Sequence, residues 1–264
     1  MSPSCPLCES AELEELFHYD RPPEGETRFD LGGQPYDRTI WRCRRCGHLI
    51  SRHELDLTGL YEGAYMDATY AGERLRQTYE RIMALPPERS DNVQRVARIV
   101  AELPDPGTVL DVGSGLGVFP GRMKEAGWEV TALDPDPRAV AHIREVVGVT
   151  AVQADFMEAD ELGTFDLVTF NKVLEHVTDP VAMLARSARY PRPGGTVYVE
   201  LPDGELAAAE GPGREELFIE HHHAFSMVSL CLLAARAGFV VRRCERMREP
   251  SDKLTLAAFL HRAP

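Results

Sequence analysis

The sequence predicts an α/β fold with a mostly parallel sheet of seven strands, an antiparallel hairpin at one edge of the sheet, and a small N-terminal module. From residue 107 onward, apolar strand-like runs alternate with helical patterns, which is typical of a parallel sheet covered by helices on both faces. The last two strand-like runs have no helix between them, so we expect them to form the hairpin. Two Cys-x-x-Cys pairs near the N-terminus mark the separate module.

The chain divides into three regions. Residues 1–55 form the cysteine-bearing module, with strands expected at 12–17 and 36–43. Residues 56–104 form a helical bridge, because apolar side chains recur at helical spacing over 73–85 and 90–103. Prolines follow both helices and end them. Residues 105–264 form the main domain, and we expect the tyrosine-rich bridge to cover its substrate pocket.

The main domain supplies the parallel sheet. Its expected strands lie at 108–112, 130–133, 149–153, 165–170, 196–201, 239–244 and 254–260, and its expected helices at 118–126, 137–147, 180–190 and 226–237. Segment 205–215 is rich in small residues and contains Gly-Pro-Gly, so we interpret it as a mobile loop or lid. Cys231 lies among leucines and is expected in the core.

Composition narrows the classes of function. The 264 residues carry a formal net charge of -13, which disfavours nucleic-acid partners because affinity for phosphate backbones comes largely from Lys and Arg. No apolar run approaches the roughly 20 residues that span a bilayer. The N-terminus lacks the basic and apolar segments of a signal peptide, so we expect a cytoplasmic protein without a membrane partner. Six cysteines, four of them in two pairs, suit a reducing compartment better than a disulfide framework.

The two cysteine pairs predict a metal site. Cys5 and Cys8 form the first pair, and Cys43 and Cys46 the second. Four thiolates satisfy tetrahedral zinc and leave no position open for water, so the predicted zinc is structural. The alternative is a pair of redox-active or merely exposed dithiols.

The most informative stretch is Thr108-Val-Leu-Asp-Val-Gly-Ser-Gly-Leu-Gly117, an apolar strand that runs into a glycine turn and opens a helix. Glycine lets the backbone turn tightly and approach a ligand closely. A dinucleotide-binding turn needs a third glycine at position 118, which is Val118. The spacing therefore favours S-adenosylmethionine (SAM) over NAD. The candidate cofactor-binding residues of the turn are Asp111, Gly113, Ser114, Gly115 and Gly117.

Acidic residues end the next two strands. Asp134 lies at the position where a carboxylate accepts both ribose hydroxyls of a nucleoside cofactor. Asp155 ends the following strand and is placed to accept from an adenine amino group, while Phe156 packs on the ring. Each feature alone is compatible with a solvated strand end. Their succession in one βαβαβ unit favours a cofactor site.

With these motifs, residues 107–262 resemble the class I SAM-dependent methyltransferases, which have a Rossmann-like fold. The runs Phe165-Asp-Leu-Val168, Val173-Leu-Glu-His-Val-Thr-Asp-Pro180 and Pro193-Gly-Gly195 are similar to the later motifs of that family. The resemblance implies that Asp134 holds the ribose and Asp155 the adenine. It also implies that Asn171 and Lys172 border the methionine end of SAM.

A narrower resemblance concerns the acceptor. The N-terminal zinc module, the Leu-Glu-His stretch and a later Glu-His pair resemble the C-methyltransferases of antibiotic deoxysugar pathways. That resemblance implies catalytic roles for Glu220, His221 and His176, with His221 as the base that deprotonates a carbon beside a keto group. It also implies that Tyr65 or Tyr70 belongs to the family's tyrosine-rich segment. Phe218 stands where the family has Tyr, and the family's large C-terminal domain has no counterpart before Pro264.

Several alternatives stay open. The acceptor is either a deoxysugar or another keto or hydroxyl metabolite. His176 serves either in catalysis or in packing of the sheet edge. The run Glu220-His-His-His223 is also compatible with a metal site or a solvated helix start. Two other classes of function are a zinc-finger RNA methyltransferase, which the net charge disfavours, and a non-catalytic SAM-binding protein. The acceptor atom and the oligomeric state are not predicted.

Overall fold

The computed structural model describes residues 4–28, 31, 33–55 and 73–263. The tyrosines expected over the substrate pocket, Tyr65 and Tyr70, lie outside these residues, as does the first part of the helical bridge. Among the described residues, no helix has both the length and the apolar character needed to cross a membrane.

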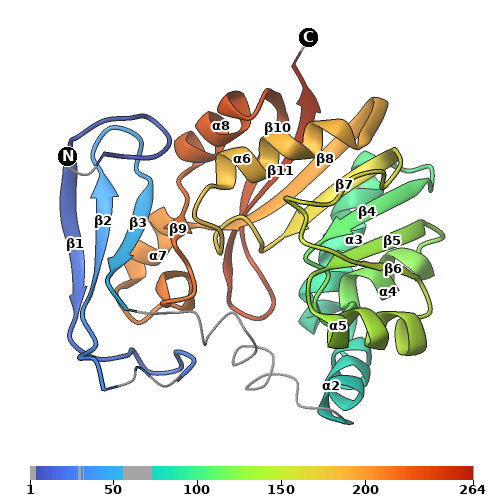
Figure 1. Cartoon of the computed structure of the whole chain (residues 1–264), viewed down its shortest axis with the longest axis horizontal. Coiled ribbons are helices and arrows are strands. Elements are labelled where there is room, and N and C mark those ends of the chain that lie inside the picture. Colours follow the sequence, from blue (N-terminus) through green and yellow to red (C-terminus); the bar gives the residue numbers. More distant parts are fainter. Residues whose placement is uncertain (1–3, 29–30, 32, 56–72, 264) are drawn as a thin grey trace.

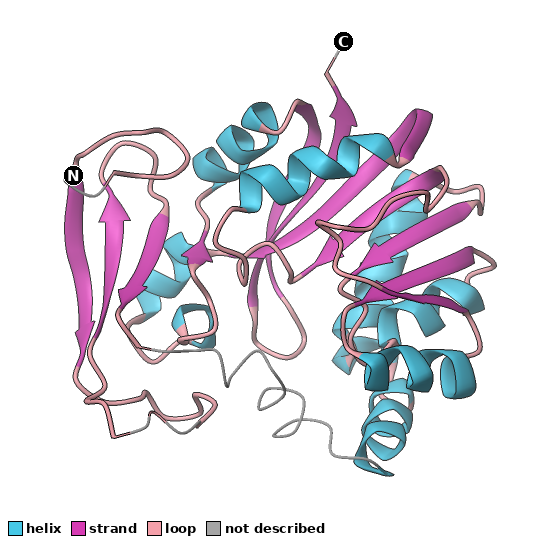
Figure 2. Cartoon of the chain, in the orientation of Figure 1, coloured by secondary structure: helices cyan, strands magenta, loops and turns pink. Residues whose placement is uncertain are grey.

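The large sheet confirms the predicted α/β fold. It has seven strands in the order β10-β11-β8-β7-β4-β5-β6. Their bounds are β4 (Thr108–Val112), β5 (Glu129–Asp134), β6 (Thr150–Gln153), β7 (Phe165–Asn171), β8 (Pro191–Pro202), β10 (Phe239–Arg248) and β11 (Leu254–Arg262). Strands β8, β7, β4, β5 and β6 are parallel, and β10 and β11 form the antiparallel hairpin at the edge. Figure 2 shows this sheet as the centre of the molecule.

Helices cover both faces of the large sheet. The described helices are α2 (Glu73–Met83), α3 (Asp91–Glu102), α4 (Val118–Glu125), α5 (Pro137–His142), α6 (Pro180–Arg186), α7 (Gly204–Glu210) and α8 (Met227–Arg236). Of these, α2 packs against the start of α4 and α7 packs against the N-terminal module. Short 3₁₀ turns lie at Pro87–Arg89, Ser187–Arg189 and Glu215–Leu217, and a π-helical turn extends α5 over Ile143–Val147. Apolar side chains of α3 and α4 pack on one face of the sheet, and those of α6 and α8 on the other.

Local sequence signals explain where these helices begin. Ser90 caps α3 by accepting from the backbone N–H of Val93, and Asp179 caps α6 in the same way. Such caps satisfy N–H groups that the first helical turn leaves without a partner. Within α3, Val96 and Ile99 lie three residues apart on one face and are buried. In α3 the cap and the apolar spacing therefore indicate the same helix.

The N-terminal module contains a second, four-stranded sheet in the order β1-β2-β3-β9. Its strands are β1 (Leu13–Tyr19), β2 (Arg38–Cys43), β3 (Leu49–His53) and the two-residue β9 (His223–Ala224). The sequence analysis predicted β1 and β2 and missed the other two. Figure 1 shows β9 and α7 between this small sheet and the main domain. The module is thus completed by a segment that lies some 170 residues later in the chain, and the domain boundary near residue 55 stays a prediction.

Two expectations about local structure were wrong, namely a loop over 205–215 and a buried Cys231, while the interpretation of 205–215 as a lid stays a prediction. The segment interpreted as a loop or lid begins with helix α7, which Asp203 caps by accepting from two backbone N–H groups. Arg214, just after α7, forms ion pairs with Glu210, Glu216 and Asp252, which anchor the rest of the segment. Cys231 is exposed, because the core-facing positions of α8 are Leu230, Leu233 and Ala234.

Candidate cofactor and acceptor cleft

One open cleft runs along the carboxyl ends of the parallel strands and has a volume of about 1300 Å³. The last residues of four parallel strands line it: Val112 of β4, Asp134 of β5, Asn171 of β7 and Pro202 of β8. Ligands of open α/β sheets bind outside these ends, where the chain leaves the sheet in two directions. The cleft has two ends, which differ in chemistry.

The glycine turn forms the wall at the first end. Gly113, Gly115 and Gly117 all have positive φ, which glycine adopts without steric cost. A Cβ at Gly117 would lie 2.9 Å from side-chain atoms of both Ile143 and Val147, whereas a Cβ at Gly115 would meet no atom within 4 Å. Gly117 therefore lets the turn pack against the helix after β5, and Gly115 faces open space in the cleft wall.

Asp134 lies at the centre of this end. Its carboxylate accepts from the backbone N–H of Gly115 at 2.7 Å and from that of Asp136 at 2.9 Å. Burial raises the pKa of Asp134 above its ordinary value, while the two backbone donors oppose that shift. The side chain is held in one orientation with its oxygens at the cleft wall, as a ribose-binding carboxylate requires.

Asp155 and Phe156 line the same end of the cleft. Asp155 accepts from the backbone N–H of Met157 at 2.8 Å. The ring of Phe156 is only 3% exposed and packs edge-on against Phe170, so most of its surface belongs to the core. The structure brings both residues beside Asp134, as the sequence predicted.

Three of the predicted cofactor residues lie behind the cleft wall. Asp111, Ser114 and Gly117 are absent from the residues that line the cleft. Asp111 is buried and accepts from Thr169 at 2.7 Å and from the Asn171 side chain at 2.9 Å. Burial raises the pKa of Asp111 to about 6. These residues support the turn and orient Asn171, which does line the cleft.

Two histidines form the second end. The rings of His176 and His221 are 4.8 Å apart between centroids and inclined by 60°. Nδ1 of His176 lies 2.9 Å from the carbonyl oxygen of Glu220, and Nδ1 of His221 lies 2.9 Å from that of Glu216. Because a carbonyl oxygen only accepts, both Nδ1 atoms carry the proton, and both Nε2 atoms have a lone pair when the rings are neutral. Burial holds the pKa of His221 well below its usual range, which favours that neutral form.

Charged groups surround the histidine pair. Glu175 is fully buried, and neither of its carboxylate oxygens has a hydrogen-bond partner among the described residues. Burial raises the pKa of Glu175, and it lowers that of Lys172, which donates to Thr255 at 2.7 Å. Burial also raises the pKa of Glu220. One potential ligand atom from each of Glu175, His176 and His221 lies within 4.8 Å of the others, so a cation is geometrically possible there too.

The sequence analysis missed a buried ion pair near this end. Arg38 of β2 and Glu26 have fully buried side chains that meet at 3.0 Å. Arg38 also donates to the carbonyl oxygen of Leu217, and Glu26 accepts from the backbone N–H of Ile219. The sequence offered a weak signal, an arginine beside apolar strand residues, but nothing that named its partners.

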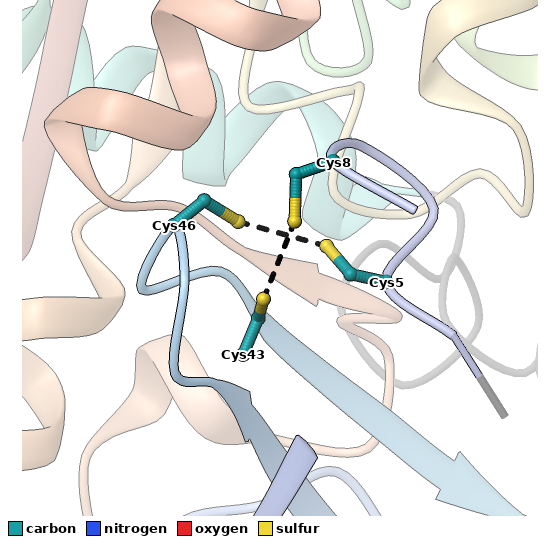
Figure 3. Close-up of side chains that lie close together, drawn as sticks. All are labelled: Cys5, Cys8, Cys43 and Cys46. Atoms are coloured by element: carbon teal, nitrogen blue, oxygen red, sulfur yellow. Dashed lines mark hydrogen bonds between the residues drawn. The ribbon is translucent and has the colours of Figure 1, made fainter. Parts of the chain in front are cut away.

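The four predicted metal ligands meet in the N-terminal module, and Figure 3 shows their sulfur atoms turned toward one another. The Sγ atoms of Cys5 and Cys46 are 3.6 Å apart, and those of Cys8 and Cys43 are 3.4 Å apart. Tetrahedral zinc with bonds of about 2.3 Å places its sulfur ligands roughly 3.8 Å from one another, so the cluster fits that ion. His48, two residues after Cys46, is not part of the cluster and pairs with His223 instead.

Comparison with known proteins gives a consistent result. A protein-family model described as "Methyltransferase domain" matches residues 79–243, more than half of the chain. The chain is 36% identical over 116 residues to the ubiquinone biosynthesis O-methyltransferase of Xanthomonas campestris pv. campestris (strain B100), covering 41% of this chain and 48% of that protein. The chain thus spans about half the length of the curated relatives it matches.

Solved structures share the fold. The 1,6-didemethyltoxoflavin-N1-methyltransferase of Burkholderia thailandensis has a TM-score of 0.58 at 20% identity, covering 86% of this chain and 96% of that one. The magnesium protoporphyrin IX methyltransferase of Synechocystis PCC 6803 has a TM-score of 0.57 at 17% identity, covering 79% and 100%. The predicted Rossmann-like class I methyltransferase fold is confirmed.

Proposed function

Because the chain belongs to the methyltransferase-domain family, we propose that it transfers the methyl group of SAM to a small-molecule acceptor. The prediction of a SAM-dependent methyltransferase is confirmed at the level of this family. The observation that carries the proposal is the continuous cleft, which joins the glycine turn and Asp134 at one end to the histidine pair at the other. Its volume of about 1300 Å³ exceeds the roughly 300–1,000 Å³ typical of one small ligand, so it has room for a cofactor and an acceptor.

In this proposal SAM lies over the glycine turn. Asp134 accepts from the ribose hydroxyls, and Asp155 and Phe156 border the adenine. Gly113, Gly115 and Asn171 line the rest of the cofactor end, with Asp111, Ser114 and Gly117 behind them. The methyl group then points toward Lys172 and the histidines.

The acceptor end supports ionisation of an acceptor by a neutral base. We propose that Nε2 of His221 removes a proton from a carbon beside a keto group, as in a deoxysugar-like metabolite, or from a hydroxyl. The new bond joins the acceptor atom to the methyl carbon as the sulfur–methyl bond breaks, and S-adenosylhomocysteine leaves. His176 and Glu220 complete this proposed catalytic group. The lone pair on Nε2, fixed by the Nδ1 contact with Glu216, supports the role of His221.

We further propose that the four cysteines hold a structural zinc ion and that the protein works in the cytosol. Four cysteines gathered as potential metal ligands suit a reducing compartment better than a disulfide framework. Zinc bound to four thiolates stabilises the module and takes no part in the transfer, because no coordination position remains open. The net charge of -13 continues to disfavour nucleic acid as the acceptor.

The test is transfer of labelled methyl groups from SAM to three acceptor classes: nucleotide-linked ketosugars, small hydroxylated metabolites and bulk RNA. We expect label in a small molecule, and a loss of at least 100-fold in His221→Ala, within the range that general bases contribute. His18→Ala is the matched control, because His18 is half-exposed in β1 and remote from the cleft. Calorimetry of SAM binding to both variants shows whether the cofactor end is intact.

Each result has a distinct meaning. Label only in RNA would overturn the proposed acceptor class. SAM binding without transfer to any class would favour a non-catalytic SAM-binding protein. A chelator could abolish activity while the cysteine-bound metal stays in place. That result would show that His176 and His221 bind a cation and do not transfer a proton.

A further inference from the structure

The N-terminal module holds the segment that carries Glu220 and His221 from both sides of these two residues. The backbone of β9 pairs with β3, where Leu49 lies opposite Ala224 and Ile50 opposite His223. Further along, the backbone N–H of Ser51 donates to the carbonyl oxygen of His222 at 3.0 Å. These contacts fix the carboxyl side of the segment, immediately after His221.

The amino side of the same segment rests on the buried ion pair. Arg38 donates to the carbonyl oxygen of Leu217, and the backbone N–H of Ile219 donates to Glu26 at 2.7 Å. Tyr36 ties the pair together, since its hydroxyl donates to Glu26 at 2.6 Å and accepts from Arg38 at 2.9 Å. All three side chains are less than one-tenth exposed.

The main domain holds the segment from the other side. The backbone N–H groups of His222 and His223 point to the carbonyl oxygen of Glu175, at 2.8 and 3.3 Å. Nδ1 of His176 lies 2.9 Å from the carbonyl oxygen of Glu220. The contact between the two histidine rings therefore depends on a segment whose position the N-terminal sheet determines.

We infer that Glu26 and Arg38 are positioning residues of the acceptor end: their buried ion pair holds residues 217–219 so that His221 faces His176. This inference rests on the proposed function for its catalytic consequence. It assigns to the N-terminal module a role besides zinc binding, which is to form part of the acceptor site. Neither residue lies at the cofactor end, so SAM affinity is not expected to depend on them.

The chemistry of the pair makes the inference testable. Removing one partner of a buried ion pair leaves an uncompensated charge and is destabilising, whereas replacing both partners by apolar residues of similar size is often neutral. The double variant Glu26→Leu/Arg38→Met therefore keeps a filled core, yet it offers neither a donor to Leu217 nor an acceptor to Ile219. It leaves no uncompensated buried charge, so its loss of stability is expected to be smaller than that of either single substitution.

The experiment uses the full chain in three forms: wild type, the double variant, and the control Glu14→Leu/Arg42→Met. Glu14 and Arg42 also pair across β1 and β2, but they lie at the surface of the small sheet. Hydrogen–deuterium exchange is followed in peptides that cover 215–224 and 108–117. Thermal unfolding, SAM binding and methyl transfer to the acceptor class that wild type labels are measured on the same samples.

For the double variant we expect exchange over 215–224 at least tenfold faster, exchange over 108–117 unchanged, and SAM affinity unchanged. We expect kcat to fall at least tenfold while the protein remains folded. The control should match wild type in every readout. Unchanged exchange over 215–224 in the folded double variant would overturn the inference, as would faster exchange with unchanged kcat. If wild type labels no acceptor, the proposed function fails, and the exchange data still decide whether the ion pair holds the segment.

Discussion

Two glycines of the cofactor turn are predicted to fail in different ways when each is replaced by alanine. Gly117→Ala places a methyl group 2.9 Å from side-chain atoms of Ile143 and Val147, inside the packed interface between α4 and the turn after α5. Gly115→Ala places its methyl group where no atom lies within 4 Å, at the wall of the cleft. Both positions have positive φ, at 73° and 50°.

The structure sets the expected magnitudes. A side chain in the left-handed region costs about 1–2 kcal/mol, a term that both variants share. Overpacking of a filled core adds about 1–3 kcal/mol, and only Gly117→Ala incurs it. We therefore expect Gly117→Ala to lower the free energy of unfolding by about 2–5 kcal/mol, and Gly115→Ala by about 1–2 kcal/mol. For SAM affinity we expect the larger loss in Gly115→Ala, because this position faces the cleft. The affinity of that variant should fall about tenfold, equivalent to about 1.4 kcal/mol.

Urea unfolding and SAM calorimetry on the two variants measure these quantities. A third variant, Gly117→Ala/Val147→Ala, removes one of the two clashing side chains. We expect the loss in the double variant to be smaller than the sum of the two single losses by at least about 0.5 kcal/mol, because the two positions are in contact. Equal stability losses in Gly115→Ala and Gly117→Ala, or strict additivity in the double variant, would refute the assignment of Gly117 to packing.

Three further predictions concern the cofactor end and the zinc site. Asp134→Asn should weaken SAM binding about 10- to 100-fold in calorimetry, since charge-assisted hydrogen bonds contribute about 1.5–3 kcal/mol; unchanged affinity would exclude Asp134 from the ribose site. The raised pKa of Asp111, about 6 against an ordinary 3.8, means that the folded state binds the proton more tightly than the unfolded state. Stability from this group is therefore lost as the pH rises from about 4 to about 6, and wild type should lose about 3 kcal/mol relative to Asp111→Asn over that window in urea titrations. Cys43→Ser should reduce the bound zinc in elemental analysis from about one ion per chain and lower the unfolding temperature, whereas Cys231→Ser should change neither.

The parallel sheet was predictable because its signals are local. Each strand is a short apolar run, and each following helix begins with a cap or a glycine turn within a few residues. The same locality explains why Asp134 and Asp155 were recognised: each ends its own strand, and parallel strands bring their carboxyl ends to one edge. A Cys-x-x-Cys pair is local in the same sense, so the sequence indicated that the four cysteines cluster, although Cys8 and Cys43 are 35 positions apart.

Features that depend on distant partners were not predictable. Strand β9 has two residues and therefore no periodicity, and it exists only because β3 offers it an open edge. Helix α7 was mistaken for a loop because glycine and proline follow it closely, yet three consecutive alanines and the Asp203 cap favour a helix over 204–210. For β9 the deciding interaction lies outside the window that a local pattern covers, whereas the signals for α7 were local and were misread.

The buried ion pair shows why the acceptor end is harder to predict than the cofactor end. The proposed ribose-binding carboxylate and the glycine turn belong to one βαβ unit, so their relation is contained in about 25 residues of sequence. The histidine pair is assembled from a loop after β7 and a segment after α7, and that segment is fixed by Glu26 and Arg38, more than 175 residues away. Only the folded chain shows that these parts meet. Because the N-terminal module supplies contacts on both sides of His221, we expect the geometry of the proposed acceptor site to vary with that module while the cofactor site does not.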